Sequence, residues 1–408
     1  MSQENSMGVL PDGWSVQSLS LAADVVMGQS PPGASYNEDG VGAPFFQGKA
    51  EFGQMYPTVR KWTTAGSKHA KVGDILLSVR APVGPTNVAD IDCAIGRGLA
   101  AIRAKNHMNQ VFLLWFLRSF EHEIAAKGTG TTFDSISGDA LRNQSINVPP
   151  LEEQEKIVEI LEEQLSRLDA ALASVRLVRE KAVRFRRSLL HAAFTGALTE
   201  GWRQLTLNEA CELITDGSHF SPATVESGMP YITVRDLGES GINFLNCKFI
   251  TRESFSDLAR NGCQPLKNDV LFSKDGTVGK VALVNDEREF VVLSSLAIVR
   301  PRKDVISSSF LKLSMQSPSF LETALGLKTG TALRRIVLRN LKTVKMAVPP
   351  LKEQEKIAGI LEEQLSRLGA ALSVADAIEI KISAARRSLL HAAFTGNLTK
   401  EWREGAHV

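Results

Sequence analysis

The sequence of 408 residues predicts an α+β protein, in which two globular α/β domains alternate with two long helices that arose by internal duplication. Three observations support this prediction. Residues 148–202 align without a gap to residues 348–402, and 36 of the 55 positions are identical. Each copy contains a heptad-like spacing of leucines, which is typical of a long packed helix. The two intervening segments share a mixed pattern of short strands and turns, and they are weakly similar to each other.

Each repeated segment has the start and stop signals of one long helix. Both copies open with VPPL, and proline is favoured in the first turn of a helix but excluded from later turns. Gly196 and Gly396 follow the last periodic residue and predict the helix ends. A helix of about 40 residues would be roughly 60 Å long. A leucine stripe alone usually marks a core face, but the duplication favours two helices that pair with each other as a scaffold.

The repeats define the domain boundaries. The sequence VGDILLSVRAPVG at 72–84 resembles KNDVLFSKDGTVG at 267–279, so the segments between the repeats also derive from one ancestor. The helices stay alike while these segments diverge, which indicates a shared partner for the helices and different targets for the domains. We expect globular domains at 1–147 and 203–347, helical segments at 148–202 and 348–402, and a tail at 403–408.

Composition places few limits on function. The formal net charge is only +2, so any electrostatic signal for a partner must be local. The four cysteines form no CxxC pair, which predicts small buried side chains in a reducing compartment rather than zinc ligands or disulfides. The N-terminus lacks the pattern of a signal peptide, and no stretch approaches the roughly 18 apolar residues of a membrane span. We therefore expect a cytoplasmic protein without membrane contact.

Motifs for catalysis are missing from the sequence. There is no GxxxxGK[ST] phosphate loop. VPPL shares its prolines with the tetrapeptide of adenine methyltransferases but has neither the polar first residue nor the aromatic last one. No cluster of acidic residues with a lysine predicts a nuclease metal site. We expect no catalytic residue, no metal ligand and no cofactor on this chain.

Basic stretches without carboxylates occur in both globular domains. They cover residues 52–73 and 93–107 in the first domain and 328–345 in the second. Cations, threonine hydroxyls and glycine backbone N–H groups in such stretches can bind phosphates. A solvated basic face is the alternative for any single stretch. Three of them, distributed over both domains, favour nucleic acid.

The repeat boundaries resemble those of a known family. PPLxEQxxI at 149–157 and 349–357, and RRSLLHAAFTGxLT at 186–199 and 386–399, resemble the DNA-specificity subunit of type I restriction–modification systems. The resemblance implies a non-catalytic subunit of a methyltransferase and endonuclease complex. Its two target recognition domains would each read one half of a bipartite, asymmetric site in double-stranded DNA. Its helices would form an antiparallel coiled coil that sets the unread spacer.

The same resemblance implies partners and cofactors. Two methyltransferase subunits would dock on the helices and methylate adenine N6 with S-adenosylmethionine. Up to two motor-nuclease subunits would join them and consume ATP with Mg²⁺. No cofactor would bind the specificity chain itself.

Candidate site residues follow from these expectations. Arginine and lysine can read guanine, and glutamine can read adenine, while threonine can bind phosphate or base. The candidate DNA-binding residues are Gln47, Lys49, Arg60, Lys61, Arg80, Arg97, Thr129, Thr131, Arg235, Lys274, Lys280, Thr329, Thr331, Arg334 and Arg335. The repeated helix ends supply the candidate partner-binding residues Arg186, Arg187, Leu189, Leu190, Phe194, Arg386, Arg387, Leu389, Leu390 and Phe394; for the arginines, helix–helix contacts are the alternative.

Three alternative functions remain open from the sequence. The chain could serve a system whose methyltransferase and nuclease are fused. It could be a coiled-coil scaffold that binds proteins without sequence-specific DNA binding. It could also be a free-standing enzyme, which the absence of catalytic motifs disfavours.

Overall fold

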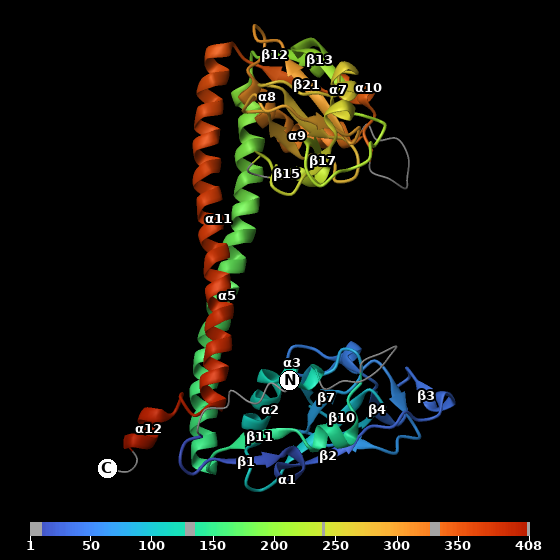
Figure 1. Cartoon of the computed structure of the whole chain (residues 1–408), viewed down its shortest axis with the longest axis vertical. Coiled ribbons are helices and arrows are strands. Elements are labelled where there is room, and N and C mark those ends of the chain that lie inside the picture. Colours follow the sequence, from blue (N-terminus) through green and yellow to red (C-terminus); the bar gives the residue numbers. More distant parts are fainter. Residues whose placement is uncertain (1–9, 127–134, 239–240, 327–334, 406–408) are drawn as a thin grey trace. The chain divides into compact units, whose positions relative to one another are not determined.

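The computed structural model describes residues 10–126, 135–238, 241–326 and 335–405. It divides into two compact units (Figure 1), each of which contains one globular domain and one half of each long helix. Unit 1 comprises Met1–Val175 and Ala377–Val408, and unit 2 comprises Arg176–Asp376. We call the elements before the first long helix domain 1, and those between the long helices domain 2.

Domain 1 is built from short strands and helices. Its elements are β1 (Ser15–Ser18), α1 (Leu19–Ala22), β2 (Ala23–Met27), η1 (Gly33–Ser35), β3 (Tyr36–Asn37), β4 (Ala43–Phe46), η2 (Lys49–Glu51), β5 (Trp62–Thr63), β6 (His69–Ala70), β7 (Ile75–Ser78), β8 (Thr86–Val88), β9 (Cys93–Ile95), β10 (Leu99–Ala104), α2 (Gln110–Ser119), α3 (Glu121–Ala126), α4 (Gly138–Arg142) and β11 (Ser145–Val148).

Domain 2 follows the same plan. Its elements are η3 (Gly196–Thr199), β12 (Arg203–Thr206), α6 (Leu207–Ala210), β13 (Cys211–Asp216), β14 (Met229–Ile232), η4 (Val234–Asp236), β15 (Leu237–Gly238), β16 (Gly241–Ile242), β17 (Lys248–Ile250), α7 (Arg252–Arg260), β18 (Val270–Ser273), β19 (Val281–Leu283), β20 (Val291–Val292), β21 (Leu296–Pro301), α8 (Ser308–Met315), α9 (Pro318–Gly326), α10 (Leu338–Lys342) and β22 (Lys345–Val348).

The two domains have matching sheets. A four-stranded antiparallel sheet has the order β2-β10-β7-β8 in domain 1 and β13-β21-β18-β19 in domain 2. Each domain also has one parallel pair, β4 with β9 and β14 with β20. Two-stranded ladders β1-β11 and β12-β22 precede the long helices. The predicted duplication of an α+β domain is therefore confirmed.

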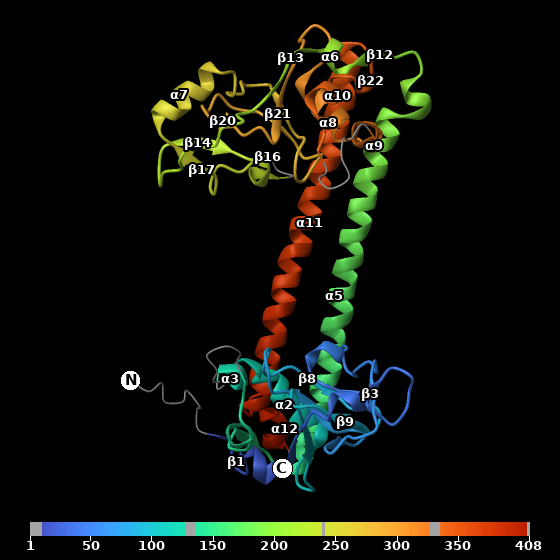
Figure 2. The same cartoon turned by 90° about the vertical axis from the view of Figure 1, so that its right-hand side faces the viewer.

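The repeats form two continuous helices of 44 residues each, α5 (Leu151–Phe194) and α11 (Leu351–Phe394). Their halves lie side by side in both views (Figures 1 and 2) and run antiparallel within each unit. In unit 1, Arg386 Nη1 donates to Asp169 Oδ1 at 2.7 Å. In unit 2, Arg179 Nη2 donates to Asp376 Oδ1 at 2.5 Å. These contacts confirm that the repeated helices pair with each other.

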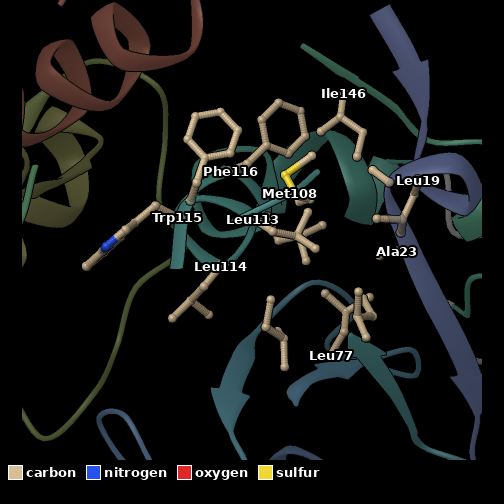
Figure 3. Packing of buried hydrophobic residues seen from close by; sticks show 14 of the residues in the cluster. Leu19, Ala23, Leu77, Met108, Leu113, Leu114, Trp115, Phe116 and Ile146 are labelled. Atoms are coloured by element: carbon tan, nitrogen blue, oxygen red, sulfur yellow. The ribbon is translucent and has the colours of Figure 1, made fainter. Parts of the chain in front are cut away.

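The repeated RRSLLHAAF segment packs against the globular domain of its own unit. In unit 1, Phe394 is 1% exposed, and its ring centroid lies 5.4 Å from that of Phe112 and 5.3 Å from that of Phe116 on α2. Phe116 gathers with Leu113 and other apolar residues of this core (Figure 3). In unit 2, Phe194 makes the matching contact with Phe310 on α8, at 5.2 Å.

This packing corrects part of the partner-binding prediction. Leu190, Phe194 and Phe394 are at most 9% exposed, so they leave no surface for another subunit. Leu189, Leu389 and Leu390 also pack against the chain's own cores. The segment is repeated because two similar domains each dock on one helix end.

The basic candidates on these helix ends have contacts within the chain as well. Arg186 Nη2 donates to Gln316 Oε1 at 3.3 Å, and Arg187 Nη2 donates to Glu322 Oε1 at 3.1 Å. Arg386 makes the helix–helix ion pair described above. Arg187 and Arg387 remain exposed, so their role in binding a partner stays a prediction.

The glutamine of the PPLxEQ motif joins each long helix to its domain. Gln154 Oε1 accepts from Asn109 N at 2.7 Å, and its Nε2 donates to His107 O and Pro149 O. Gln354 repeats the arrangement, accepting from Ser307 N at 2.8 Å. Both glutamine residues have 0% exposure. Since Asn109 and Ser307 are the N-caps of α2 and α8, the motif fixes the start of one helix against the start of another.

The C-terminal end differs from the predicted tail. Residues Lys400–Gly405 form a short helix, α12, which belongs to unit 1. Arg403 from this helix reaches the buried carboxylate of Glu153 at the start of α5. The segment after α11 is thus part of the folded unit up to residue 405.

Candidate nucleic-acid interface

Four loops of domain 1 meet at one end of its sheets. Gly28 N donates to Leu99 O at 2.9 Å, and Val79 N donates to Gly98 O at 2.9 Å. Gly96 N donates to Phe46 O at 2.8 Å. We call this end, made of residues 28–32, 46–49, 79–84 and 96–98, the loop face of domain 1.

The loop face brings together most of the candidates in domain 1. Gln47, Arg80 and Arg97 are exposed on three of its loops, and Lys49 is exposed in η2 beside them. Arg60 and Lys61 directly precede β5, which pairs with β4. Lys61 O accepts from Phe45 N at 2.8 Å. Six candidates of domain 1 are therefore exposed on or beside its loop face, and their contact with DNA stays a prediction.

Domain 2 has a loop face built in the same way. Gly217 N donates to Leu296 O at 3.0 Å, and Lys274 N donates to Ser295 O at 2.9 Å. Leu293 N donates to Ile232 O at 3.0 Å. The loop face of domain 2 consists of residues 217–222, 233–236, 274–280 and 293–295.

Two candidates in domain 2 have structural roles instead. Lys274 has a side chain that is 1% exposed, and its Nζ lies 3.2 Å from Asp216 Oδ1. A cation that is buried against a carboxylate cannot reach DNA, so its assignment as a DNA-binding residue was wrong. Lys280 Nζ donates to Val234 O at 3.1 Å and to Leu237 O at 2.8 Å, which holds the η4 turn in place.

Arg235 and Arg335 are the exposed candidates of domain 2. Arg235 lies in the η4 turn that Lys280 holds. Arg335 Nε is 3.8 Å from Asp275 Oδ2, and both side chains are more than a third exposed. An ion pair with this exposure contributes little to stability, so Arg335 remains available to a phosphate.

Matching positions on the two loop faces carry different charges. The backbone of Arg80 bridges to Ser135 in domain 1, and the backbone of Asp275 bridges to Arg335 in domain 2. In domain 1 the cation of this bridge is Arg80, on the loop after β7. In domain 2 it is Arg335, on the segment before α10. Two similar scaffolds present different side chains, as two domains with different targets would.

Five candidates lie outside the residues that the structure describes. They are Thr129, Thr131, Thr329, Thr331 and Arg334. Their assignment to DNA binding stays a prediction.

Two further arginines, one in each domain, form ion pairs with buried aspartates. Arg103 Nε and Nη2 donate to Asp74 at 2.7 and 2.6 Å, and Arg300 donates twice to Asp269 at 2.8 Å. The hydrogen bonds to these carboxylates raise the pKa of both guanidinium groups. Because the pair occurs at matching positions of both domains, it supports the fold rather than one target.

An exposed aromatic residue on the loop face of domain 2 was not among the candidates predicted from the sequence. Phe220 is 70% exposed and follows His219, whose side chain is 68% exposed. A single phenylalanine after a strand usually indicates a core residue. Only the neighbouring turn residues in DGSHFSP could have signalled that it lies in a loop.

Other features of the described residues bear on alternative functions. No group of three or more His, Cys, Asp or Glu residues among them could hold a metal ion. No described helix is both long and apolar enough to cross a bilayer. The four cysteines are free and buried, as the sequence predicted.

Comparison with known proteins gives consistent results. Residues 11–173 and 199–372 match the family model described as the type I restriction modification DNA specificity domain. The chain is 36% identical over 199 residues to a putative type I restriction enzyme MjaX specificity subunit from Methanocaldococcus jannaschii, covering 48% of this chain and 46% of that protein. It is 24% identical to the EcoKI specificity subunit from Escherichia coli K12, covering 98% of this chain and 92% of that protein.

Solved structures share the fold. A chain from a study of complex assembly and conformational transition in the type I R-M system covers 95% of this chain and 99% of its own length, with a TM-score of 0.77 and 20% identity. The HsdS subunit from Thermoanaerobacter tengcongensis covers 95% of this chain and 98% of its own length, with a TM-score of 0.58 and 21% identity. At these identities the likeness concerns the fold alone.

Proposed function

Because the chain belongs to the type I restriction–modification DNA specificity family, we propose that each of its globular domains reads one half of a bipartite, asymmetric site in double-stranded DNA. The observation that carries this proposal is the pair of loop faces. They have the same backbone plan, but they expose different side chains at matching positions. A duplicated scaffold with divergent loops suits two different half-sites.

The exposed cations would act in two ways. Contacts to phosphates fix the register of a protein on DNA, while contacts to base edges give specificity. Arg80 and Arg97 are exposed on two loops of the loop face of domain 1, and we assign them to base edges, where arginine pairs with guanine O6 and N7. Arg60 and Lys61, at the side of the same face, are assigned to phosphates.

The catalytic steps belong to other subunits in this proposal. Two methyltransferase subunits would bind S-adenosylmethionine and methylate adenine N6, and up to two motor-nuclease subunits would use ATP and Mg²⁺. The long helices offer a surface for docking, because they expose large apolar side chains. Phe185 is 50% exposed in unit 2, and Ile380 is 70% exposed in unit 1. Exposed apolar residues of this size are typical of interaction surfaces. A cytoplasmic location, with access to the chromosome, follows from the role.

Substitutions on one loop face test the proposal. We expect Arg80→Ala and Arg97→Ala to weaken binding of the assembled complex to its site by roughly 10-fold each, and to relax specificity in the half-site of domain 1 alone. Lys61→Ala should weaken binding to all sequences alike and lower its salt dependence. Binding would be measured at several salt concentrations with cognate and scrambled duplexes. Equal affinity of the wild-type complex for both duplexes would contradict the proposal and favour a protein scaffold.

A further inference from the structure

The turn after β13 holds a phenyl ring in solvent on the loop face of domain 2. Phe220 is 70% exposed, while Ser218, two residues earlier, is 4% exposed. Exposing an aromatic ring to water forgoes the free energy that burial would provide. The ring lies on a face that also exposes Arg235, so it is available for a contact that forms on binding.

The backbone on both sides of the ring is held rigidly. Ser218 Oγ accepts from Phe220 N at 3.1 Å and donates to Phe220 O at 2.6 Å. Ser218 N in turn donates to Val292 O at 2.8 Å, and Ser218 O accepts from Ser294 N at 2.8 Å. One buried serine thus fixes both backbone groups of Phe220 to the core of the domain, which limits the entropy lost when the ring meets a ligand.

The base of this turn is also fixed. A Cβ at Gly217 would lie 2.3 Å from Val292 O, so only glycine allows this approach. Asp216, the last residue of β13, is paired with the buried Lys274 at 3.2 Å. His219 Nε2 lies 3.5 Å from the other carboxylate oxygen of Asp216. Lys274 therefore has a structural role: it anchors the strand that carries the turn.

The matching turn of domain 1, which lies among the described residues, carries no exposed aromatic ring. Gly28 and Gly217 occupy matching positions, since each donates its N–H to the first residue of the paired strand, Leu99 or Leu296. Counting from these glycines, Phe220 corresponds to Pro31, which is buried. The ring is therefore a feature that separates the two domains.

We propose that Phe220 is a specificity-determining residue of domain 2, and that its ring contacts the C5 methyl group of a thymine in the major groove of the half-site. This inference rests on the proposed function. The thymine methyl is the apolar group that the major groove displays, and phenylalanine is among the side chains that contact it. Arg235 and Arg335, exposed at the same end of the domain, would hold the flanking phosphates.

The test uses the full-length chain assembled with its methyltransferase. Affinity is measured for the mapped site and for duplexes in which each thymine of the domain 2 half-site is replaced singly by deoxyuridine, which lacks the methyl group. One replacement should weaken wild-type binding about fourfold, the effect of leaving one methyl group unburied. Phe220→Ala should weaken binding to the parent site. In this variant, the deoxyuridine replacement that weakens wild-type binding should cause no further loss of affinity. Phe220→Leu should retain part of it.

A matched control comes from the other end of the same domain. Leu266 is 51% exposed and precedes β18, whose far end leads to the loop face. Leu266→Ala should leave the deoxyuridine pattern unchanged. The inference would be overturned if Phe220→Ala and each deoxyuridine replacement lowered the affinity independently, so that their effects added at every position. It would also be overturned if Phe220→Ala weakened binding to scrambled DNA as much as binding to the mapped site. If the wild-type complex still recognises a bipartite DNA motif, either of these results leaves the proposed function intact. If the wild-type complex recognises no bipartite motif, the proposed function itself is contradicted.

Discussion

The guanidinium of Arg403 is paired with the carboxylate of Glu153, which is 2% exposed. The same carboxylate accepts from Trp14 Nε1 at 2.9 Å and from Thr399 Oγ1 at 2.6 Å. Segments from the start, the middle and the end of the chain therefore meet at one buried acid in unit 1. Its counterpart in the second repeat, Glu353, is exposed.

Removing the cation from this site should destabilise unit 1. We expect Arg403→Ala to lower the free energy of unfolding by about 3 kcal/mol, because it leaves a buried carboxylate without its charge partner. Arg203→Ala, at an exposed position in the first strand of domain 2, is the control and should change stability little. Urea unfolding of the full chain measures both. Equal midpoints for the two variants would show that α12 contributes nothing to the fold.

The motif glutamines should matter equally in both units. Gln154→Ala and Gln354→Ala each remove three hydrogen bonds to backbone groups near a helix start. Unsatisfied buried groups should lower stability by about 2–4 kcal/mol in each case. Glu155→Ala, on the exposed side of the same helix, serves as the control. Thermal unfolding would detect the loss, and a variant as stable as the control would contradict this account of the motif.

The ion pair between Arg300 and Asp269 is predicted to be structural. Asp269 is 1% exposed, so Arg300→Met should cost about 3 kcal/mol by leaving the acid unpaired. Arg302→Met, at an exposed neighbouring position, should be nearly neutral. The difference in unfolding midpoint between the variants decides the matter. If Arg300→Met folded normally but lost DNA affinity, Arg300 would belong to the interface instead.

The buried thiols make stability depend on alkaline pH. Burial raises the pKa of Cys93 and of Cys211 from 9.0 to about 12. The unfolded chain therefore ionises first, so stability is complete below about pH 9 and declines as the pH rises toward 12. At pH 8 we expect a disulfide reagent to leave both thiols unmodified in the native protein and to modify them in denaturant. Rapid modification in native conditions would contradict their burial.

The duplication made much of the fold predictable. Two signals, the prolines of VPPL and the glycines at 196 and 396, bracketed helices that the structure places at Leu151–Phe194 and Leu351–Phe394. The partners of the repeated segment were not predictable, because an apolar face that docks on a domain of the same chain has the same pattern as one that docks on another subunit. Phe394 illustrates this ambiguity: its contacts with Phe112 and Phe116 cross more than 270 residues of sequence.

The candidate site shows the same limit. Exposed cations such as Arg60 and Arg97 could be found from stretches that lack acids. Lys274 could not be separated from them, because its partner Asp216 lies on a different strand. Burial of a charge depends on such tertiary pairing, which local sequence does not report.

In the proposed function, this chain directs adenine methylation to a split DNA sequence. Long-read sequencing of genomic DNA, from cells that express the chain together with its methyltransferase, maps N6-methyladenine directly. The account predicts a bipartite motif that is present with the chain, absent without it, and altered in one half only by substitutions on one loop face. A methylation pattern that does not change when the chain is removed would contradict it.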